Sequence, residues 1–184
     1  SVRLLKCRRV VFTACLFCIH TIMSFKCSRV FLPGMYTKEE ASRQRQAFWT
    51  TLGQYMRPVL SADGERVNWV NYKTGVPSVY FRMDAGTGGA HITIEITHGY
   101  RGDRVACFAK FESMRAVLHE TLGEEWEWAE SRVDEHGREI SSVSMQLYGV
   151  NIMRQEDWPE LISFFKQRII ALDEFWSMAK YGFE

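Results

Sequence analysis

Two neighbouring segments, residues 79–84 and 91–97, alternate apolar and polar side chains one by one. The stretch Ala85-Gly86-Thr87-Gly88-Gly89 separates them. Strict alternation is typical of a strand with one buried face, and glycine reaches the positive φ of a tight turn at no steric cost. The pattern therefore predicts a β-hairpin with one apolar and one polar face.

The polar face of this hairpin collects the residues most suited to chemistry. If Asp84 lies opposite His91, Arg82 and Glu95 become diagonal neighbours on adjacent strands. Tyr80 then lies directly opposite Glu95. We expect any binding or catalytic activity of the sheet to begin with these side chains.

The remaining periodicity supplies the other elements. Apolar residues at helical spacing predict helices over about 38–57, 104–122 and 156–180, and alternation predicts strands over about 66–72, 124–130 and 138–148. The element order is then α-β-β-β-α-β-β-α. It indicates a single α/β (α+β) domain, with a mixed or antiparallel sheet of about five strands and three packing helices.

Residues 124–130 alternate acidic and aromatic side chains, which predicts a strand with tryptophans inward and carboxylates outward. Outward carboxylates repel a second acidic strand, so they protect a sheet edge from aggregation. The same run could instead bind a basic or apolar partner.

Charge divides the chain near Met35. Residues 1–34 carry six basic residues and no acidic one, leaving 17 basic residues against 22 acidic residues in the remainder, a net charge of −5. An acidic domain is a poor non-specific binder of the phosphate backbone of nucleic acid.

The first 34 residues form a leader that lies outside the domain. Residues 10–23 are mostly apolar and follow basic residues, which imitates a signal peptide, but they are too few for the roughly 20 residues of a membrane span. Pro33-Gly34 breaks the chain, and Thr37 to Glu40 forms a capping box directly after Met35. We expect native translation to begin at Met35 and the domain to cover residues 35–184, with a signal or anchor segment as the alternative.

Cysteine usage points to a reducing compartment. Four of the five cysteines lie in the leader, and Cys107 alone lies in the domain, on a helical apolar pattern. Such a cysteine is typical of a small core residue. We therefore expect a cytoplasmic protein with no membrane association.

A family resemblance rests on these segments: Met35-Tyr36-Thr37-Lys38-Glu39-Glu40, Phe48-Trp49, Asn68-Trp69-Val70-Asn71-Tyr72-Lys73-Thr74-Gly75, Tyr80-Phe81-Arg82-Met83-Asp84, Leu118-His119-Glu120, Gly123-Glu124-Glu125-Trp126-Glu127-Trp128, Glu156-Asp157-Trp158-Pro159 and Arg168-Ile169-Ile170-Ala171-Leu172-Asp173-Glu174-Phe175-Trp176. Together they resemble a bacterial family, domain of unknown function 4268, over about residues 35–184. The family has no established activity. Members that look fused to nuclease-like domains imply a role near DNA processing or defence, by association only.

The enzymatic alternative is a divergent metal-dependent nuclease. The expected element order is similar to the core of restriction-endonuclease-like folds, where an Asp and an Asp/Glu-x-Lys on adjacent strands hold Mg²⁺. Asp84 and Glu95 would be the metal ligands here. Thr97 stands where the lysine is required, so Lys73 or Arg82 would have to replace it. The simpler interpretation is a solvated Arg82–Glu95 pair.

We therefore predict a non-catalytic binding or accessory module that needs no metal or cofactor. Tyrosine and arginine together offer rigid contact area and bidentate recognition of anions. The partner would be an unknown protein or a nucleic-acid-associated one, and the sequence leaves the oligomeric state open. The expected binding patch comprises Asn71, Tyr72, Lys73, Tyr80, Arg82 and Glu95.

Overall fold

A computed structural model describes residues 36–183 of the chain. The predictions about the leader lie outside these described residues. No helix within the described range is both long and apolar enough to cross a bilayer.

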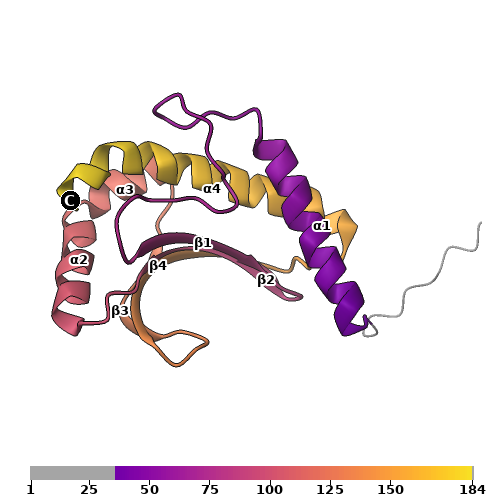
Figure 1. Ribbon diagram of the computed structural model, residues 1–184, viewed down its shortest axis with the longest axis horizontal. Helices are drawn as coiled ribbons and strands as arrows, with labels where there is room; N and C mark the ends of the chain where they lie inside the picture. The colour runs from indigo at the N-terminus through magenta and orange to yellow at the C-terminus, as the bar shows by residue number, and fades with distance from the viewer. Residues whose placement is uncertain (1–35, 184) are drawn as a thin grey trace, which may run out of the picture. The chain divides into compact units, whose positions relative to one another are not determined.

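The described part is an α+β domain with a four-stranded antiparallel sheet (Figure 1). The spatial order of the strands is β1-β2-β4-β3. The predicted fold class is confirmed, in its antiparallel form and with four strands and four α-helices. The elements are α1 (Lys38–Met56), β1 (Val79–Ala85), β2 (Gly89–Ile96), α2 (Arg101–Ser113), α3 (Arg115–Leu122), β3 (Glu127–Val133), β4 (Glu139–Tyr148), η1 (Gln155–Asp157), α4 (Trp158–Ala179) and η2 (Lys180–Gly182).

The β1–β2 hairpin has the predicted register. Asp84 lies opposite His91, and Tyr80 lies opposite Glu95. The apolar residues of both strands face the helices, and Ile92 and Ile94 are fully buried there. One pattern of alternation thus fixes both the pairing and the buried face.

The predicted strand over residues 66–72 is wrong, because this segment is irregular, with a bend and turn at residues 69–71 between α1 and β1. The Asn68 side-chain oxygen accepts a hydrogen bond from the Asn71 backbone N–H at 3.2 Å. Such local side-chain bonds compete with a sheet ladder for the backbone. The apolar residues pack instead against the core: Trp69 is 3% exposed, and Tyr72 stacks on Phe81 with ring centroids 5.3 Å apart.

The predicted helix over residues 104–122 is two helices, α2 and α3, which meet at Met114. Met114 has φ −104° and ψ 11°, outside the helical region. The Ser113 hydroxyl donates to the Lys110 carbonyl at 2.7 Å, so a side chain engages a carbonyl at the end of α2. The chain changes direction there, and α3 runs beside α4 (Figure 1).

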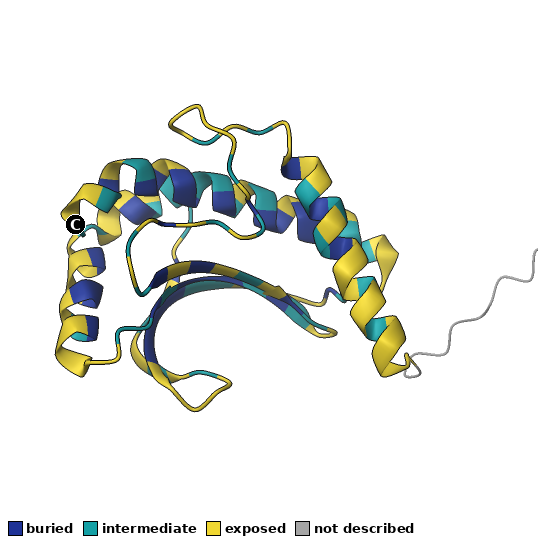
Figure 2. Ribbon diagram, viewed as in Figure 1, coloured by how far each residue is buried: buried dark blue, intermediate teal, exposed yellow. Residues whose placement is uncertain are grey.

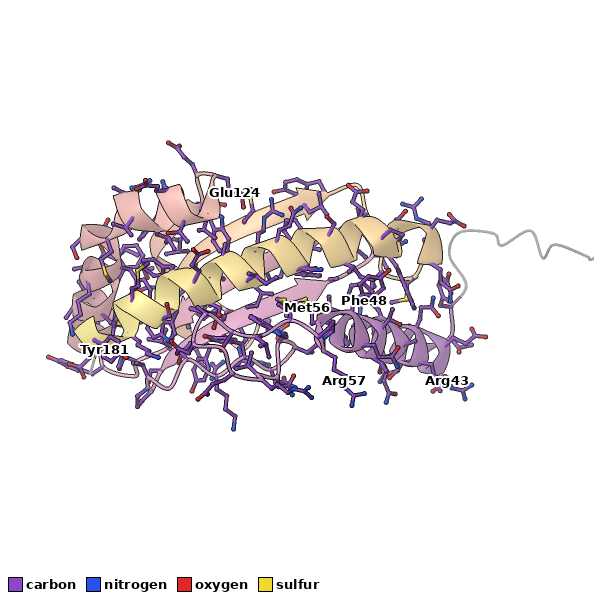
Figure 3. All side chains as sticks on the ribbon, turned by 90° about the horizontal axis from the view of Figure 1, so that it is seen from above. Arg43, Phe48, Met56, Arg57, Glu124 and Tyr181 are labelled. Carbon is purple, nitrogen blue, oxygen red and sulfur yellow. The ribbon has the colours of Figure 1, made fainter. Side chains whose placement is uncertain are left out.

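The helices cover one face of the sheet, and α4 lies lengthwise over it (Figures 1 and 2). Between them lies an aromatic core in which Phe111 stacks on Trp176 with centroids 5.9 Å apart. Helix α1 turns Phe48 and Met56 inward, whereas Arg43 and Arg57 point away from the molecule (Figure 3). Within residues 36–183 no helix lies on the opposite face of the sheet (Figure 1), and we call it the open face.

The segment 57–78 is fastened to α4 by buried polar contacts. The Asp173 carboxylate, on a residue only 5% exposed, accepts hydrogen bonds from the Tyr72 hydroxyl and the Ala62 backbone N–H, both at 2.6 Å. Burial and the Asp173 carboxylate raise the pKa of the Tyr72 phenol far above its ordinary value. The Trp176 indole donates to the Thr74 carbonyl at 2.7 Å. Every polar group named here has a partner, so these contacts fix structure.

Strand β3 is an edge of the sheet, as the acid-aromatic pattern suggested. Its flanking Trp126 is 3% exposed, whereas Glu127 and Glu130 are exposed. The arrangement agrees with an acidic edge, and the binding of a partner at this edge stays a prediction. Cys107 is buried as expected, and burial raises the pKa of its thiol to about 11, which makes the thiol a poor nucleophile.

Candidate charged cavity on the open face

A polar cavity of about 740 Å³ is lined mainly by residues of the open face, and also by Arg45 of α1 and by Met83 and Ala85 at the end of β1. The end of β1, part of β2 and the β3–β4 turn form its walls, and the β3–β4 hairpin curls away from the helices on this side (Figure 1). We call it the charged cavity. Its lining residues are Arg45, Arg82, Met83, Asp84, Ala85, Gly86, His91, Glu95, Arg132, Val133, Asp134, Glu135, His136 and Arg138.

Glu95 stands between two arginines that come from opposite edges of the sheet. Its carboxylate is 3.6 Å from Arg82 Nε and 3.4 Å from Arg132 Nη2. Both distances exceed the 2.7–2.9 Å that is typical of strong charge-assisted hydrogen bonds. The Arg82 and Arg132 side chains are 59% and 39% exposed. The two ion pairs are therefore loose, and both guanidinium groups keep N–H donors that Glu95 does not use.

A bulge in β3 brings Arg132 to this face. Ala129 lies opposite Ser142, but Arg132 lies opposite Ile140, so β3 contains one residue more than β4 in this interval. The extra residue reverses the alternation beyond it, because successive side chains point to opposite faces. Arg132 then reaches across β4 to Glu95 on β2.

The opposite rim of the cavity is a turn held by one carboxylate. Asp134 accepts hydrogen bonds at 2.8 Å from the backbone N–H groups of Arg138 and His136, and it also pairs with the Arg138 guanidinium. The backbone bond from Arg138 is the largest of the effects that lower the pKa of this carboxyl. Gly137 supplies the positive φ of 78° that the turn needs. The rim is thus pre-organised without a ligand.

Strand β2 also places a hydroxyl between the charged residues. Thr93 lies between His91 and Glu95 on the same side of the strand and is 1% exposed. Within residues 36–183 its hydroxyl has no hydrogen-bond partner. Buried polar groups are normally satisfied, so this one is an exception within the face that carries the cavity.

The predicted binding patch divides into two. Tyr80, Arg82 and Glu95 lie together on the open face, and the Arg82 guanidinium lies 4.9 Å from the centre of the Tyr80 ring. Asn71, Tyr72 and Lys73 instead line a separate cavity of about 520 Å³ beside Asp173 and Trp176. The expectation of a single patch fails because it depended on a strand at residues 66–72.

The two carboxylates of the nuclease alternative are not brought together. Glu95 lies opposite Tyr80, four residues along β1 from Asp84. At about 3.4 Å per residue this is roughly 14 Å. A shared Mg²⁺ needs oxygens about 2 Å from the ion. Lys73 lines the other cavity, and no group of three or more acidic, histidine or cysteine side chains in the described residues could hold a metal ion.

Sequence reasoning missed Arg132 as a neighbour of Glu95, and it missed Arg45, His136 and Arg138 as lining residues of the same cavity. The turn at residues 134–137 was predicted, but its position over the β1–β2 hairpin depends on strand order and on the bulge. The available signal in the sequence was Arg132, a basic residue on the strand that leads into this turn. Its presence alone did not indicate to which face of the sheet its side chain points.

Comparison with known proteins identifies a family and nothing more detailed. The model described as "Domain of unknown function (DUF4268)" matches residues 44–180. No curated protein and no solved structure matches the chain. The resemblance inferred from the sequence motifs is confirmed.

Proposed function

From the premise that this chain belongs to the DUF4268 family, which carries no assigned activity, we propose that it is a non-catalytic binding or accessory module. Its binding site is the charged cavity. The ligand presents an anionic group to Arg82 and Arg132.

The position of Glu95 carries this proposal. Two guanidinium groups hold ten N–H donors between them, and each uses one contact on the shared carboxylate. An incoming carboxylate or phosphate can therefore occupy free donors or exchange with Glu95. Arginine suits both kinds of anion, because its planar fork matches their oxygen pairs.

The size and setting of the cavity support a small ligand or a single protruding group of a larger one. Its volume of about 740 Å³ falls within the range of about 300–1,000 Å³ typical of ligand pockets. A cytoplasmic location belongs to this proposal, as does the association with DNA processing or defence. The nuclease alternative lacks comparable support, because Asp84 and Glu95 lie too far apart along the sheet.

Titration of the full chain with inorganic phosphate and with acetate tests the proposal. We expect saturable binding of at least one anion, and Arg132→Gln should weaken that binding about tenfold, since a charge-assisted hydrogen bond contributes about 1.5–3 kcal/mol. Arg43→Gln is the matched control, because it removes the same charge from the outward side of α1 (Figure 3). Equal weakening by both variants, or no binding by either anion, would refute the proposed site.

A further inference from the structure

We propose that the groove between α1 and α4 binds a small amphipathic molecule, which has an apolar body and a single carboxylate that pairs with Lys166. The groove has a volume of about 530 Å³, within the range of about 300–1,000 Å³ typical of ligand pockets. Among residues 36–183 it shares no lining residue with the charged cavity. The two sites are therefore separate, and this one does not rest on the proposed function.

Two helices supply the walls of the groove. Helix α1 packs beside the first half of α4 (Figures 1 and 3). Trp158, Ile162 and Lys166 recur every four residues along α4, as do Thr51 and Tyr55 along α1. Residues four apart share one face of a helix, so each helix presents one continuous stripe of side chains to the groove.

The walls offer mainly apolar surface. The Trp158 indole N–H donates to the Ile152 carbonyl at 2.8 Å, so the fold uses its polar end and leaves ring surface for the groove. Pro159 and Ile162 add aliphatic surface, and Tyr55, which is 60% exposed, adds a second aromatic ring. Apolar surface that faces water gains free energy when the apolar body of a ligand covers it.

Lys166 supplies a charge at this apolar surface. Among residues 36–183 it is the one charged residue that lines the groove, and it is half-buried. Its ammonium group forms no hydrogen bond or ion pair with any described residue. A half-buried charge without a partner favours a counter-ion, because it has already lost part of its hydration. The matching ligand therefore carries an anionic group next to its apolar body.

The surroundings of Lys166 limit that group to a single negative charge. Lysine offers one compact cation and lacks the planar fork with which arginine holds the oxygens of a phosphate. Glu156 and Glu160 each adjoin a lining residue in sequence and are exposed, so they repel a second negative charge. The net charge of −5 beyond residue 34 acts in the same direction. A monocarboxylate fits these conditions better than a phosphate ester.

Three molecules with the same apolar body test the site in NMR titrations of the full chain. They are 4-phenylbutanoate, 4-phenylbutan-1-ol and 4-phenylbutylammonium. We expect the carboxylate to bind about tenfold more tightly than the alcohol, because it gains a hydrogen bond between charged groups, and the ammonium to bind most weakly. The Trp158 indole N–H resonance should shift on binding, whereas that of Trp128 on β3 should not.

Two substitutions separate the charged contact from the apolar contact. Lys166→Gln should lower the affinity for 4-phenylbutanoate to that for the alcohol, and it should leave the affinity for the alcohol unchanged. Tyr55→Ala should weaken the binding of all three molecules about threefold, because it removes one aromatic wall. Lys38→Gln is the matched control and should change nothing, because Lys38 is an exposed lysine at the opposite end of α1.

Three results would overturn the site. Equal affinities for the carboxylate and the alcohol would exclude the charged contact. Binding of none of the three molecules would exclude the groove as a ligand site, whether or not the charged cavity binds phosphate. If Arg132→Gln, rather than Lys166→Gln, weakens the binding of 4-phenylbutanoate, the carboxylate occupies the charged cavity; the groove is then wrong and the proposed function stands.

Discussion

The two faces of the sheet use polar residues in opposite ways. On the helix side, the Asp173 carboxylate is 95% buried and has two donors at 2.6 Å. On the open face, Glu95 is shared by two arginines at 3.4 and 3.6 Å, and the Asp84 side chain has no hydrogen-bond or ion-pair partner among residues 36–183. The domain therefore holds a closed network between α4 and the segment 57–78, and an incompletely paired one on the open face of the sheet.

This difference distinguishes polar side chains that stabilise the fold from polar side chains whose hydrogen-bonding capacity is not used by the fold. A buried, fully satisfied carboxylate is costly to alter, because removal of it leaves its donors without acceptors. Exposed and loosely paired charges contribute little to stability, and under the proposed function their spare hydrogen-bonding capacity serves a ligand. We expect substitutions on the two faces to have clearly different effects.

The largest expected effect is at the aromatic core on the helix side. Phe111 is fully buried and contacts both Trp176 and Phe183. Phe111→Ala should lower the free energy of unfolding by about 4 kcal/mol, because it leaves a cavity in a packed core. Urea denaturation measures this loss, with Tyr80→Ala on the open face as the control, expected to lose under about 1 kcal/mol. Similar losses in both variants would contradict the contrast between the faces.

The second effect compares two aspartates. Asp173→Ala leaves the Tyr72 hydroxyl and the Ala62 N–H without an acceptor, and it should cost about 3 kcal/mol. Asp84→Ala should stay within about 0.5 kcal/mol of wild type. Thermal unfolding of the pair measures both changes. The comparison fails if Asp84→Ala is the more damaging substitution.

The third effect depends on pH. Tyr72→Phe removes one hydrogen bond and should cost about 1 kcal/mol at neutral pH. The fold raises the pKa of the Tyr72 phenol, so its contribution is complete below the unfolded value of about 10 and is lost as pH rises above that value. The stability difference between wild type and variant should therefore shrink at high pH. A difference that stays constant up to pH 11 would argue against this linkage.

The smallest effect is expected at the centre of the charged cavity. Glu95→Gln should change the free energy of unfolding by less than about 1 kcal/mol, because its ion pairs are long and partly exposed. Added salt should further reduce the difference from wild type. Denaturation at two salt concentrations checks this, and a loss like that of Asp173→Ala would show that Glu95 is structural.

The sequence was most informative where a local pattern decides the structure. Alternation over the β1–β2 hairpin predicted its register and the contact between Arg82 and Glu95. The capping box also works as expected: the Glu40 N–H donates to the Thr37 hydroxyl at 3.2 Å, at the start of α1. In both cases neighbours in sequence are neighbours in space.

Prediction failed where tertiary contacts override local preference. The segment around Trp69 alternates like a strand, but it is irregular: Asn68 accepts a hydrogen bond from the Asn71 N–H, the Trp69 indole donates to the Val59 carbonyl, and Tyr72 donates to Asp173 of α4. For a similar reason, only part of the candidate site could be predicted from the sequence. Arg82 and Glu95 share a hairpin, whereas Arg132 joins them through strand order and one bulge.

The bulge in β3 also decides how the charged cavity responds to a change in gene length. Loss of the codon for Glu130 or for Ser131 would leave two steps between Ala129 and Arg132, equal to the two steps between Ser142 and Ile140. The bulge would disappear, but the arginine would still lie opposite Ile140 on the open face, because side chains two residues apart on a strand share a face. An in-frame deletion of three nucleotides at this point would therefore be expected to make β3 regular and to leave Glu95 with its second arginine.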